Sequence, residues 1–136
     1  VPLHRDKEKK RGYNQAELLA EYAAKELGAV YWKNGIQKIR ETGSMRMADS
    51  VSRRSLLNGA FGVSAENVVK MKGCHILLVD DVCTTGSTAD ACARALKDAG
   101  ARKVTLLCFA ASAGYRQFEE TEECNEEYSE EHNEKE

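Results

Sequence analysis

A pair of adjacent carboxylates and a hydroxyl-rich turn stand out in the sequence. Residues 76 to 88 read ILLVDDVCTTGST, in which an apolar run ends at Asp80 and Asp81. Two neighbouring carboxylates repel each other, whereas the turn mainly offers hydrogen-bond donors, so the combination indicates a bound ligand. The residues of the turn that can face such a ligand are Thr84, Thr85, Gly86, Ser87 and Thr88.

The turn has the properties of a phosphate site. A helix that begins there directs backbone N–H groups and the positive end of its dipole toward the turn. Gly86 permits close approach of the backbone, and the hydroxyls add donors. Asp80 and Asp81 need partners that donate hydrogen bonds or carry positive charge, which the two hydroxyls of a ribose and a nearby Mg²⁺ supply. A ribose 5-phosphate unit therefore explains both halves of the pattern.

Other interpretations explain less. Capping of the helix by Thr85 or Ser87 accounts for one hydroxyl only. The chain contains neither GxxxxGK[ST] nor GxGxxG, so a P-loop NTPase and a dinucleotide-binding fold are unsupported. A phosphorylation receiver domain also has an acidic pair after a strand, but it needs a further aspartate after a later strand. Here the strand VTLLCFAA ends in Ala-Ser, without a carboxylate.

A strand–helix–strand unit must position these residues. The apolar run from residue 74 predicts a central parallel strand buried on both faces, and KVTLLCFAA (103–111) predicts a second buried strand. Between them, helical spacing with a stop at Gly100 predicts a helix. Parallel strands joined in this way gather ligands beyond their carboxyl ends. The apolar face of the helix comprises Ala89, Cys92, Ala93, Leu96 and Ala99.

Shorter elements are expected upstream. Asn14 with Glu17 forms a capping-box pattern before an amphipathic helix that stops at Gly28. Short strands are predicted at AVYW (29–32), IQKIR (36–40) and GAFGVSA (59–65). The polar stretch 41–58 is long for a compact domain, which is typical of a functional loop.

Composition predicts one globular domain followed by an acidic tail. The 136 residues are 42% hydrophobic and 31% charged, without a membrane-span or signal-peptide pattern, so a cytoplasmic location is expected. Residues 113–136 carry ten Glu against one Arg and one Lys and are expected to be disordered. Residues 1–112 form the predicted domain and carry a net charge of +6, which suits an anionic ligand.

The cysteines predict neither a zinc site nor a disulfide framework. Five are scattered without a CxxC pair, so reduced thiols that fill small apolar spaces are expected.

The motifs resemble a known family. ILLVDDVCTTGST matches the signature with which type I phosphoribosyltransferases bind phosphoribosyl pyrophosphate: four apolar residues, two acids, then T-G-x-T. VPLH, RGYNQAELLA, the R-x-T-G-S segment and NGAF resemble the ComF family, whose phosphoribosyltransferase-like proteins are associated with competence for DNA uptake in bacteria. The resemblance covers about residues 1–112. It implies a type I phosphoribosyltransferase α/β fold, an open and mostly parallel sheet flanked by helices, with its N-terminal part missing.

The resemblance also implies residue roles. Asp80 and Asp81 would bind the ribose hydroxyls, with Mg²⁺ as cofactor nearby. The loop Leu3-His4-Arg5 would bind pyrophosphate, although its neighbouring basic residues are equally compatible with a solvated loop. Arg40 would act in catalysis, and the segment after it would close over the reaction centre. The 5-phosphate would be bound by Thr84, Thr85, Gly86, Ser87 and Thr88.

Three functions stay open at this point. The first is transfer of the phosphoribosyl group from phosphoribosyl pyrophosphate to an unknown acceptor, with release of pyrophosphate. The second is a non-catalytic regulator that binds phosphoribosyl pyrophosphate or a nucleotide containing ribose 5-phosphate. The third is a component of DNA uptake. The partners expected with them are a second copy of the chain in a homodimer, or competence proteins.

Overall fold

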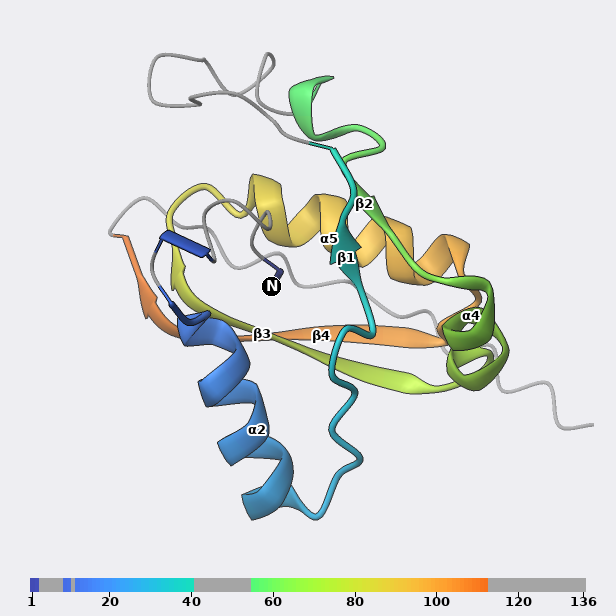
Figure 1. Cartoon of the computed structure of the whole chain (residues 1–136), viewed down its shortest axis with the longest axis horizontal. Helices are drawn as coiled ribbons and strands as arrows, with labels where there is room; N and C mark the ends of the chain where they lie inside the picture. The colour runs from blue at the N-terminus through green and yellow to red at the C-terminus, as the bar shows by residue number, and fades with distance from the viewer. Residues whose placement is uncertain (3–8, 11, 41–54, 113–136) are drawn as a thin grey trace, which may run out of the picture.

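A parallel strand pair and its connecting helix form the centre of the structure. The computed structural model describes residues 1–2, 9–10, 12–40 and 55–112 (Figure 1). Strand β3 (His75–Cys83) leads through helix α5 (Ser87–Asp98) to strand β4 (Lys103–Ala111). The two strands are parallel and in register from His75 opposite Lys103 to Cys83 opposite Ala111. The predicted strand–helix–strand unit is therefore confirmed, and so is the α/β class of the fold.

Helix α2 (Gln15–Leu27) covers the other side of the strand pair from α5 (Figure 1). Its start is fixed by Asn14, whose Oδ1 accepts from the backbone N–H of Ala16 at 3.0 Å. Gly28 ends it in the left-handed region at φ 63°, which glycine adopts without steric cost. Glu17, the second half of the expected capping box, instead accepts from the Tyr31 hydroxyl at 3.2 Å.

A short antiparallel pair lies on the α5 side of the molecule. Strand β1 (Gln37–Lys38) pairs with strand β2 (Phe61–Gly62), which places Lys38 opposite Phe61. Helix α4 (Ala65–Met71) follows and leads into β3. The strands predicted within 36–40 and 59–65 are confirmed, although each is only two residues long.

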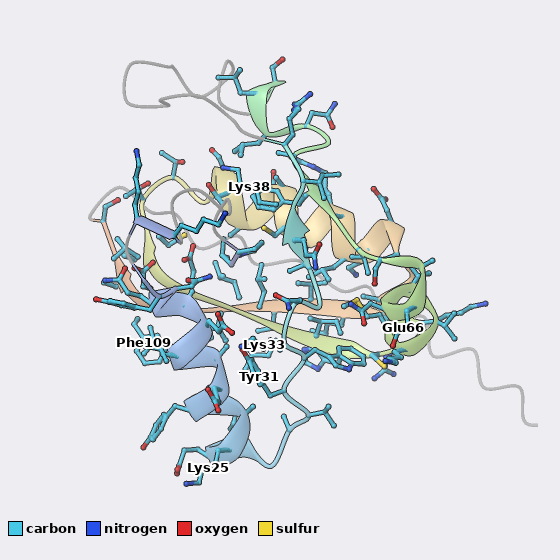
Figure 2. The ribbon with its side chains drawn as sticks, in the orientation of Figure 1. Lys25, Tyr31, Lys33, Lys38, Glu66 and Phe109 are labelled. Atoms are coloured by element: carbon cyan, nitrogen blue, oxygen red, sulfur yellow. The ribbon has the colours of Figure 1, made fainter. Side chains whose placement is uncertain are left out.

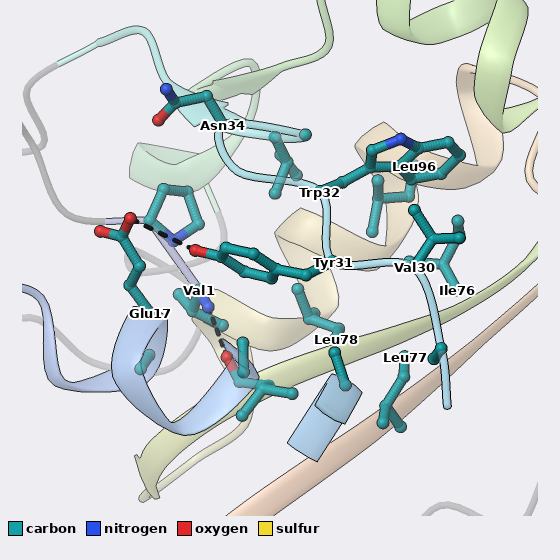
Figure 3. A pocket seen from close by; sticks show the side chains of 18 of the residues that line it. Val1, Glu17, Val30, Tyr31, Trp32, Asn34, Ile76, Leu77, Leu78 and Leu96 are labelled. Atoms are coloured by element: carbon teal, nitrogen blue, oxygen red, sulfur yellow. Dashed lines mark hydrogen bonds between the residues drawn. The ribbon is translucent and has the colours of Figure 1, made fainter. Parts of the chain in front are cut away.

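The strand predicted at residues 29–32 is wrong. This segment has no regular secondary structure and runs beside an apolar cavity of about 530 Å³ between α2 and β3 (Figure 3). Its Val30 side chain is 81% exposed. The apolar residues at positions 29–32 do not form a strand. Some of them, including Tyr31 and Trp32, line this cavity instead.

The hydrophobic core lies between α5, β3 and the segment around β2. Several of the buried residues of α5 are small, namely Ala89, Ala91 and Cys92. The cluster of buried residues comprises Leu57, Ala60, Phe61, Met71, Leu78, Ala89, Ala91, Cys92, Leu96 and Ala101. Of the helix face predicted from spacing, Ala89, Cys92 and Leu96 belong to this cluster, whereas Ala99 is buried outside it and Ala93 is half-buried. Ala91 is an additional member of the cluster.

The predicted burial of β3 on both faces is wrong, and so is the predicted burial of β4. Leu78 and Val79 of β3 are buried, but Leu77 is 37% exposed and Val82 is 54% exposed. In β4 every residue is at least partly exposed. Within the described residues, the parallel sheet consists of these two strands alone, so their outer surfaces have fewer neighbours than a central strand would have.

Several expectations fall on residues 3–8, 11, 41–54 and 113–136, outside the described part of the chain. They include the pyrophosphate loop Leu3-His4-Arg5, most of the expected closing loop, and the acidic tail. None of the helices in the described part is both long and apolar enough to span a membrane.

Candidate ligand-binding site

A cavity of about 230 Å³ lies at the carboxyl end of β3. Its lining combines the acidic pair, the following turn, the beginning of α2 and one residue each from β1 and β2. All seven residues predicted to bind a phosphoribosyl group line this one cavity: Asp80, Asp81, Thr84, Thr85, Gly86, Ser87 and Thr88. The sheet edge therefore brings the two halves of the motif around a common space, as expected for an open α/β fold.

Backbone hydrogen bonds hold the two carboxylates in place. The N–H of Asp81 donates to Asp80 Oδ1 at 3.0 Å, and the N–H of Val82 donates to Asp81 Oδ1 at 2.8 Å. Each carboxylate has a second oxygen, so each can accept from a further donor. The pair is thus oriented by its own strand, with capacity to accept from a diol.

Burial raises the pKa of Asp80 to about 6. Its interaction with the neighbouring Asp81 side chain also raises this pKa, whereas the nearby Val1 amino group and the Asp81 backbone N–H oppose the shift. Burial therefore makes the ionised form of Asp80 costly, and hydroxyl groups or a cation that approach Asp80 favour it.

The turn before α5 presents an open helix start. Gly86 occupies the N-cap position at φ 77°, where a residue with a side chain would be strained, and no side chain caps the helix. Thr85 Oγ1 and Ser87 Oγ lie 3.0 Å apart, and the Ser87 N–H reaches Thr85 Oγ1 only at 3.4 Å. The hydroxyls thus do not act as a regular cap, and the first turn of α5 keeps the character of an anion site.

Ser112, directly after β4, anchors the turn from the neighbouring strand. Its hydroxyl donates to the Thr84 carbonyl at 3.0 Å, and its N–H donates to the Cys83 carbonyl at 3.0 Å. The parallel register, which sets Cys83 opposite Ala111, makes both bonds available. In the sequence, Ser112 was noted only because no carboxylate follows the strand VTLLCFAA, and its role in positioning the turn was missed.

Lys38 and Asn14 also line the cavity and were not predicted as site residues. Lys38 is the last residue of β1, so the pairing of β1 with β2 brings it to the cavity, and no local pattern in the sequence indicates this. Asn14 Nδ2 donates to the Val1 carbonyl at 3.3 Å while Oδ1 caps α2, which joins the RGYNQ segment to the N-terminal residues. Val1 and Pro2 line the cavity as well.

Arg40 is placed differently from the phosphoribosyl-binding residues. Its Nη2 donates to the carbonyls of Leu56 and Asn58 at 3.0 and 2.6 Å, and it is not among the described residues that line the cavity. The guanidinium thus holds the end of the 41–58 segment against β1. Its predicted catalytic role stays a prediction.

The carboxylates of Asp80 and Asp81 suit a Mg²⁺ ion that is also bound by the ligand better than they suit a metal site formed by protein side chains alone. Within the described residues no group of three or more His, Cys, Asp or Glu side chains could hold a metal ion. Mg²⁺ commonly takes one or two carboxylates together with substrate phosphates and waters. Asp80 and Asp81 supply that number of carboxylates at an open cavity.

The cysteines near the site fill apolar space. Cys83 and Cys92 are buried and form no disulfide, and Cys92 belongs to the core cluster. Burial raises the pKa of Cys92 to about 12, so its thiol stays protonated at neutral pH.

The α/β fold and the cavity at the end of β3 are those expected of a phosphoribosyltransferase-like protein, and the comparison with protein families agrees. The phosphoribosyl transferase domain family matches residues 14–133 of this chain. The chain therefore belongs to the phosphoribosyl transferase domain family. The match runs beyond residue 112, where the domain was predicted to end, and that boundary stays a prediction.

The chain is also similar to curated proteins that are named for DNA utilization and competence. DNA utilization protein YhgH of Salmonella typhi is 33% identical over 108 residues, which are 79% of this chain and 46% of the relative. Competence protein F of Haemophilus influenzae is 31% identical over 107 residues, or 78% of this chain and 46% of that protein. The predicted resemblance to the ComF family is thus confirmed. The chain spans about half the length of these relatives. No solved structure matches it significantly.

Proposed function

We propose that the chain binds Mg²⁺ and phosphoribosyl pyrophosphate and transfers the phosphoribosyl group to an acceptor, with release of pyrophosphate. The observation that carries this proposal is the single cavity lined by both aspartates and by every residue of the turn from Thr84 to Thr88. Membership of the phosphoribosyl transferase domain family supports it. The ribose diol would lie at Asp80 and Asp81, and the 5-phosphate at the start of α5.

The chemistry requires positioning and control of charge. The bond between ribose C1 and the pyrophosphate oxygen breaks, its electron pair leaves with the pyrophosphate, and a nucleophilic atom of the acceptor forms the new bond to C1. Positive charge grows on the sugar ring during this step, so nearby carboxylates stabilise it. When bound, Mg²⁺ would neutralise charge on the departing diphosphate.

Other residues are proposed to serve the diphosphate. Leu3, His4 and Arg5 follow Val1 and Pro2, which line the cavity, and this sequence position supports their assignment to pyrophosphate. Arg40, which ties the end of the 41–58 segment to β1, would reach the reaction centre if that segment closes over it and excludes water.

Calorimetric titration with Mg²⁺ and phosphoribosyl pyrophosphate tests the binding claim. Replacing both aspartates, Asp80→Asn with Asp81→Asn, removes charge-assisted hydrogen bonds that are worth about 1.5–3 kcal/mol each. We therefore expect at least about a tenfold loss of affinity.

Asp90→Asn is the matched control. Asp90 also lies next to the turn, on α5, but it pairs with Arg94 at 2.6 Å and does not line the cavity. Affinity that is the same in the double variant as in the wild type would contradict the assignment of the acidic pair.

A second candidate is a non-catalytic protein that binds the same phosphosugar and acts in competence or DNA use. The names of the relatives, Competence protein F and DNA utilization protein YhgH, favour this alternative. Pyrophosphate release, measured with purine, pyrimidine and ammonia-type acceptors, separates the two functions. Release with an acceptor supports the transferase, and tight binding with no release supports the non-catalytic protein.

A further inference from the structure

The cavity needs positive charge that the phosphosugar motif itself does not provide. Asp80 and Asp81 add two carboxylates, and the turn contributes only neutral hydroxyls and backbone N–H groups. A phosphate monoester carries between one and two negative charges at neutral pH. An anion that enters beside the acidic pair would therefore be repelled unless a cation lies close by.

In addition to the Val1 amino group near Asp80 and the proposed Mg²⁺, Lys38 supplies a side-chain cation from a distant part of the sequence. Among the described residues that line the cavity, Lys38 alone has a basic side chain. It lies on β1 and lines the cavity together with the turn Thr84–Thr88 (Figure 2). Its charge also acts on the Cys92 thiol, one turn beyond the start of α5, which agrees with a position near this helix end.

The side chain of Lys38 is held by its strand partner. Pairing of β1 with β2 sets Lys38 opposite Phe61, and its ammonium group lies 5.9 Å from the centre of the Phe61 ring. Phe61 is itself 6% exposed and belongs to the core, so the ring is a fixed support. A cation over an aromatic face at this distance is attracted to the ring. The Phe61 ring thus supports the Lys38 ammonium group, and both residues line the cavity.

We propose that Lys38 is a ligand-binding residue that contacts the phosphate seated at the turn Thr84–Thr88. This inference rests on the proposed function, since it assumes that the cavity holds a ribose 5-phosphate unit. It goes beyond the motif because Lys38 is about 45 residues from the turn and reaches it only through the β1–β2 pair. Lys38 would make the site select a phosphorylated sugar.

Titration of three lysine variants with ribose 5-phosphate tests the proposal. Lys38→Met keeps most of the aliphatic stem and removes the charge, so affinity should fall about tenfold or more, as for other charge-assisted bonds. Lys38→Arg keeps the charge and should stay within about threefold of the wild type. Lys25→Met, at an exposed position in the last turn of α2, is the matched control and should bind like the wild type.

Inorganic phosphate, titrated in parallel by NMR, separates two roles of Lys38. If Lys38 contacts the phosphate, Lys38→Met weakens the binding of inorganic phosphate as well. If it acts only by neutralising the aspartates, phosphate binding stays unchanged while ribose 5-phosphate binding falls, and the proposal is overturned.

The remaining outcomes are also distinct. Equal affinity for ribose 5-phosphate in Lys38→Met and wild type overturns the role of Lys38 and leaves the proposed function standing. An equal loss in Lys38→Arg and Lys38→Met, with unchanged thermal unfolding, shows that charge is not what matters and also overturns it. A wild-type protein that binds neither phosphoribosyl pyrophosphate nor ribose 5-phosphate overturns both proposals together.

Discussion

Asp80 combines two requirements that conflict in the absence of a ligand. In its proposed role the Asp80 carboxylate would accept hydrogen bonds from a diol in its ionised form, yet burial beside Asp81 raises its pKa to about 6. A buried acid that is kept partly protonated at mildly acidic pH is a frequent property of functional sites. Its direct consequence is that ligand binding should depend on pH.

Binding of ribose 5-phosphate should strengthen as pH rises through about 6. Below this pH Asp80 holds its proton and accepts poorly; above it the carboxylate is ionised. At pH 5 about one molecule in ten would have Asp80 ionised, so affinity should be about tenfold lower than at pH 7.5. Calorimetric titration across this range measures the change.

Asp80→Asn is the control for this pH dependence, because the phosphate group of the ligand also titrates near pH 6. In this variant the pH dependence of affinity should come from the ligand phosphate alone, because the contribution of Asp80 is removed. If wild type and Asp80→Asn show the same pH profile, Asp80 does not contact the ligand.

The same shift affects folding in the opposite direction. An acid whose pKa is higher in the folded protein than in the unfolded chain binds more protons in the folded state between the two values. Stability therefore falls as pH rises from about 4 to about 6, relative to Asp80→Asn. A ligand that favours the carboxylate offsets this loss.

At the scale of the elements, the site depends on two strand ends that are tied together. Ser112 bonds the carbonyls of both Cys83 and Thr84, so the end of β4 fixes where the turn begins. The turn then enters α5 at Gly86 without a side-chain cap. A change at the end of β4 should therefore alter the turn that is proposed to bind the phosphate.

Ser112→Ala should weaken ribose 5-phosphate binding by a few-fold and lower stability by about 1 kcal/mol, the net worth of a typical hydrogen bond. Ser64→Ala is the matched control. The Ser64 hydroxyl accepts from the Asn67 N–H at 3.3 Å and caps α4, and it does not line the cavity. Loss of this cap should cost about 0.5–2 kcal/mol without an effect on affinity.

Calorimetry and thermal unfolding of both variants distinguish an effect on the site from general destabilisation. If Ser64→Ala weakens binding as much as Ser112→Ala does, the bond to the Thr84 carbonyl does not position the turn.

Elements set by local signals could be predicted from the sequence. Asn14 and Gly28 fix the ends of α2, and the spacing of Ala89, Cys92 and Leu96 identifies the packed face of α5. The strand at 29–32 could not be predicted correctly, because apolar residues beside a cavity give the same pattern as residues in a sheet. Lys38 was missed because only the pairing of β1 with β2 brings it to the turn.

At the scale of the whole molecule, segments that are far apart in sequence form one cavity. The beginning of α2, the end of β3, the turn into α5 and the β1–β2 pair all contribute to its lining. The motif predicted the acidic pair and the phosphate turn, since these lie within nine consecutive residues. The wall opposite them depends on long-range pairing, which periodicity and local motifs do not specify.

The chain covers about half the length of its curated relatives. The relatives YhgH and Competence protein F are about twice as long as the matching region, since it covers 46% of each. The cavity proposed to recognise a sugar phosphate lies within the residues described for this chain. The choice of acceptor, and any action in DNA use, are functions of the whole protein and belong to the proposals above.

The most direct test of the central claim is an NMR titration of the whole chain with Mg²⁺ and ribose 5-phosphate. We predict that the largest changes in amide resonances fall on residues 80–89, with Thr85 to Thr88 changing as the phosphate binds and Asp81 and Val82 as the diol binds. Helix α4, which does not line the cavity, should change little. Changes that avoid residues 80–89, or that concentrate at the apolar cavity between α2 and β3, would contradict the account.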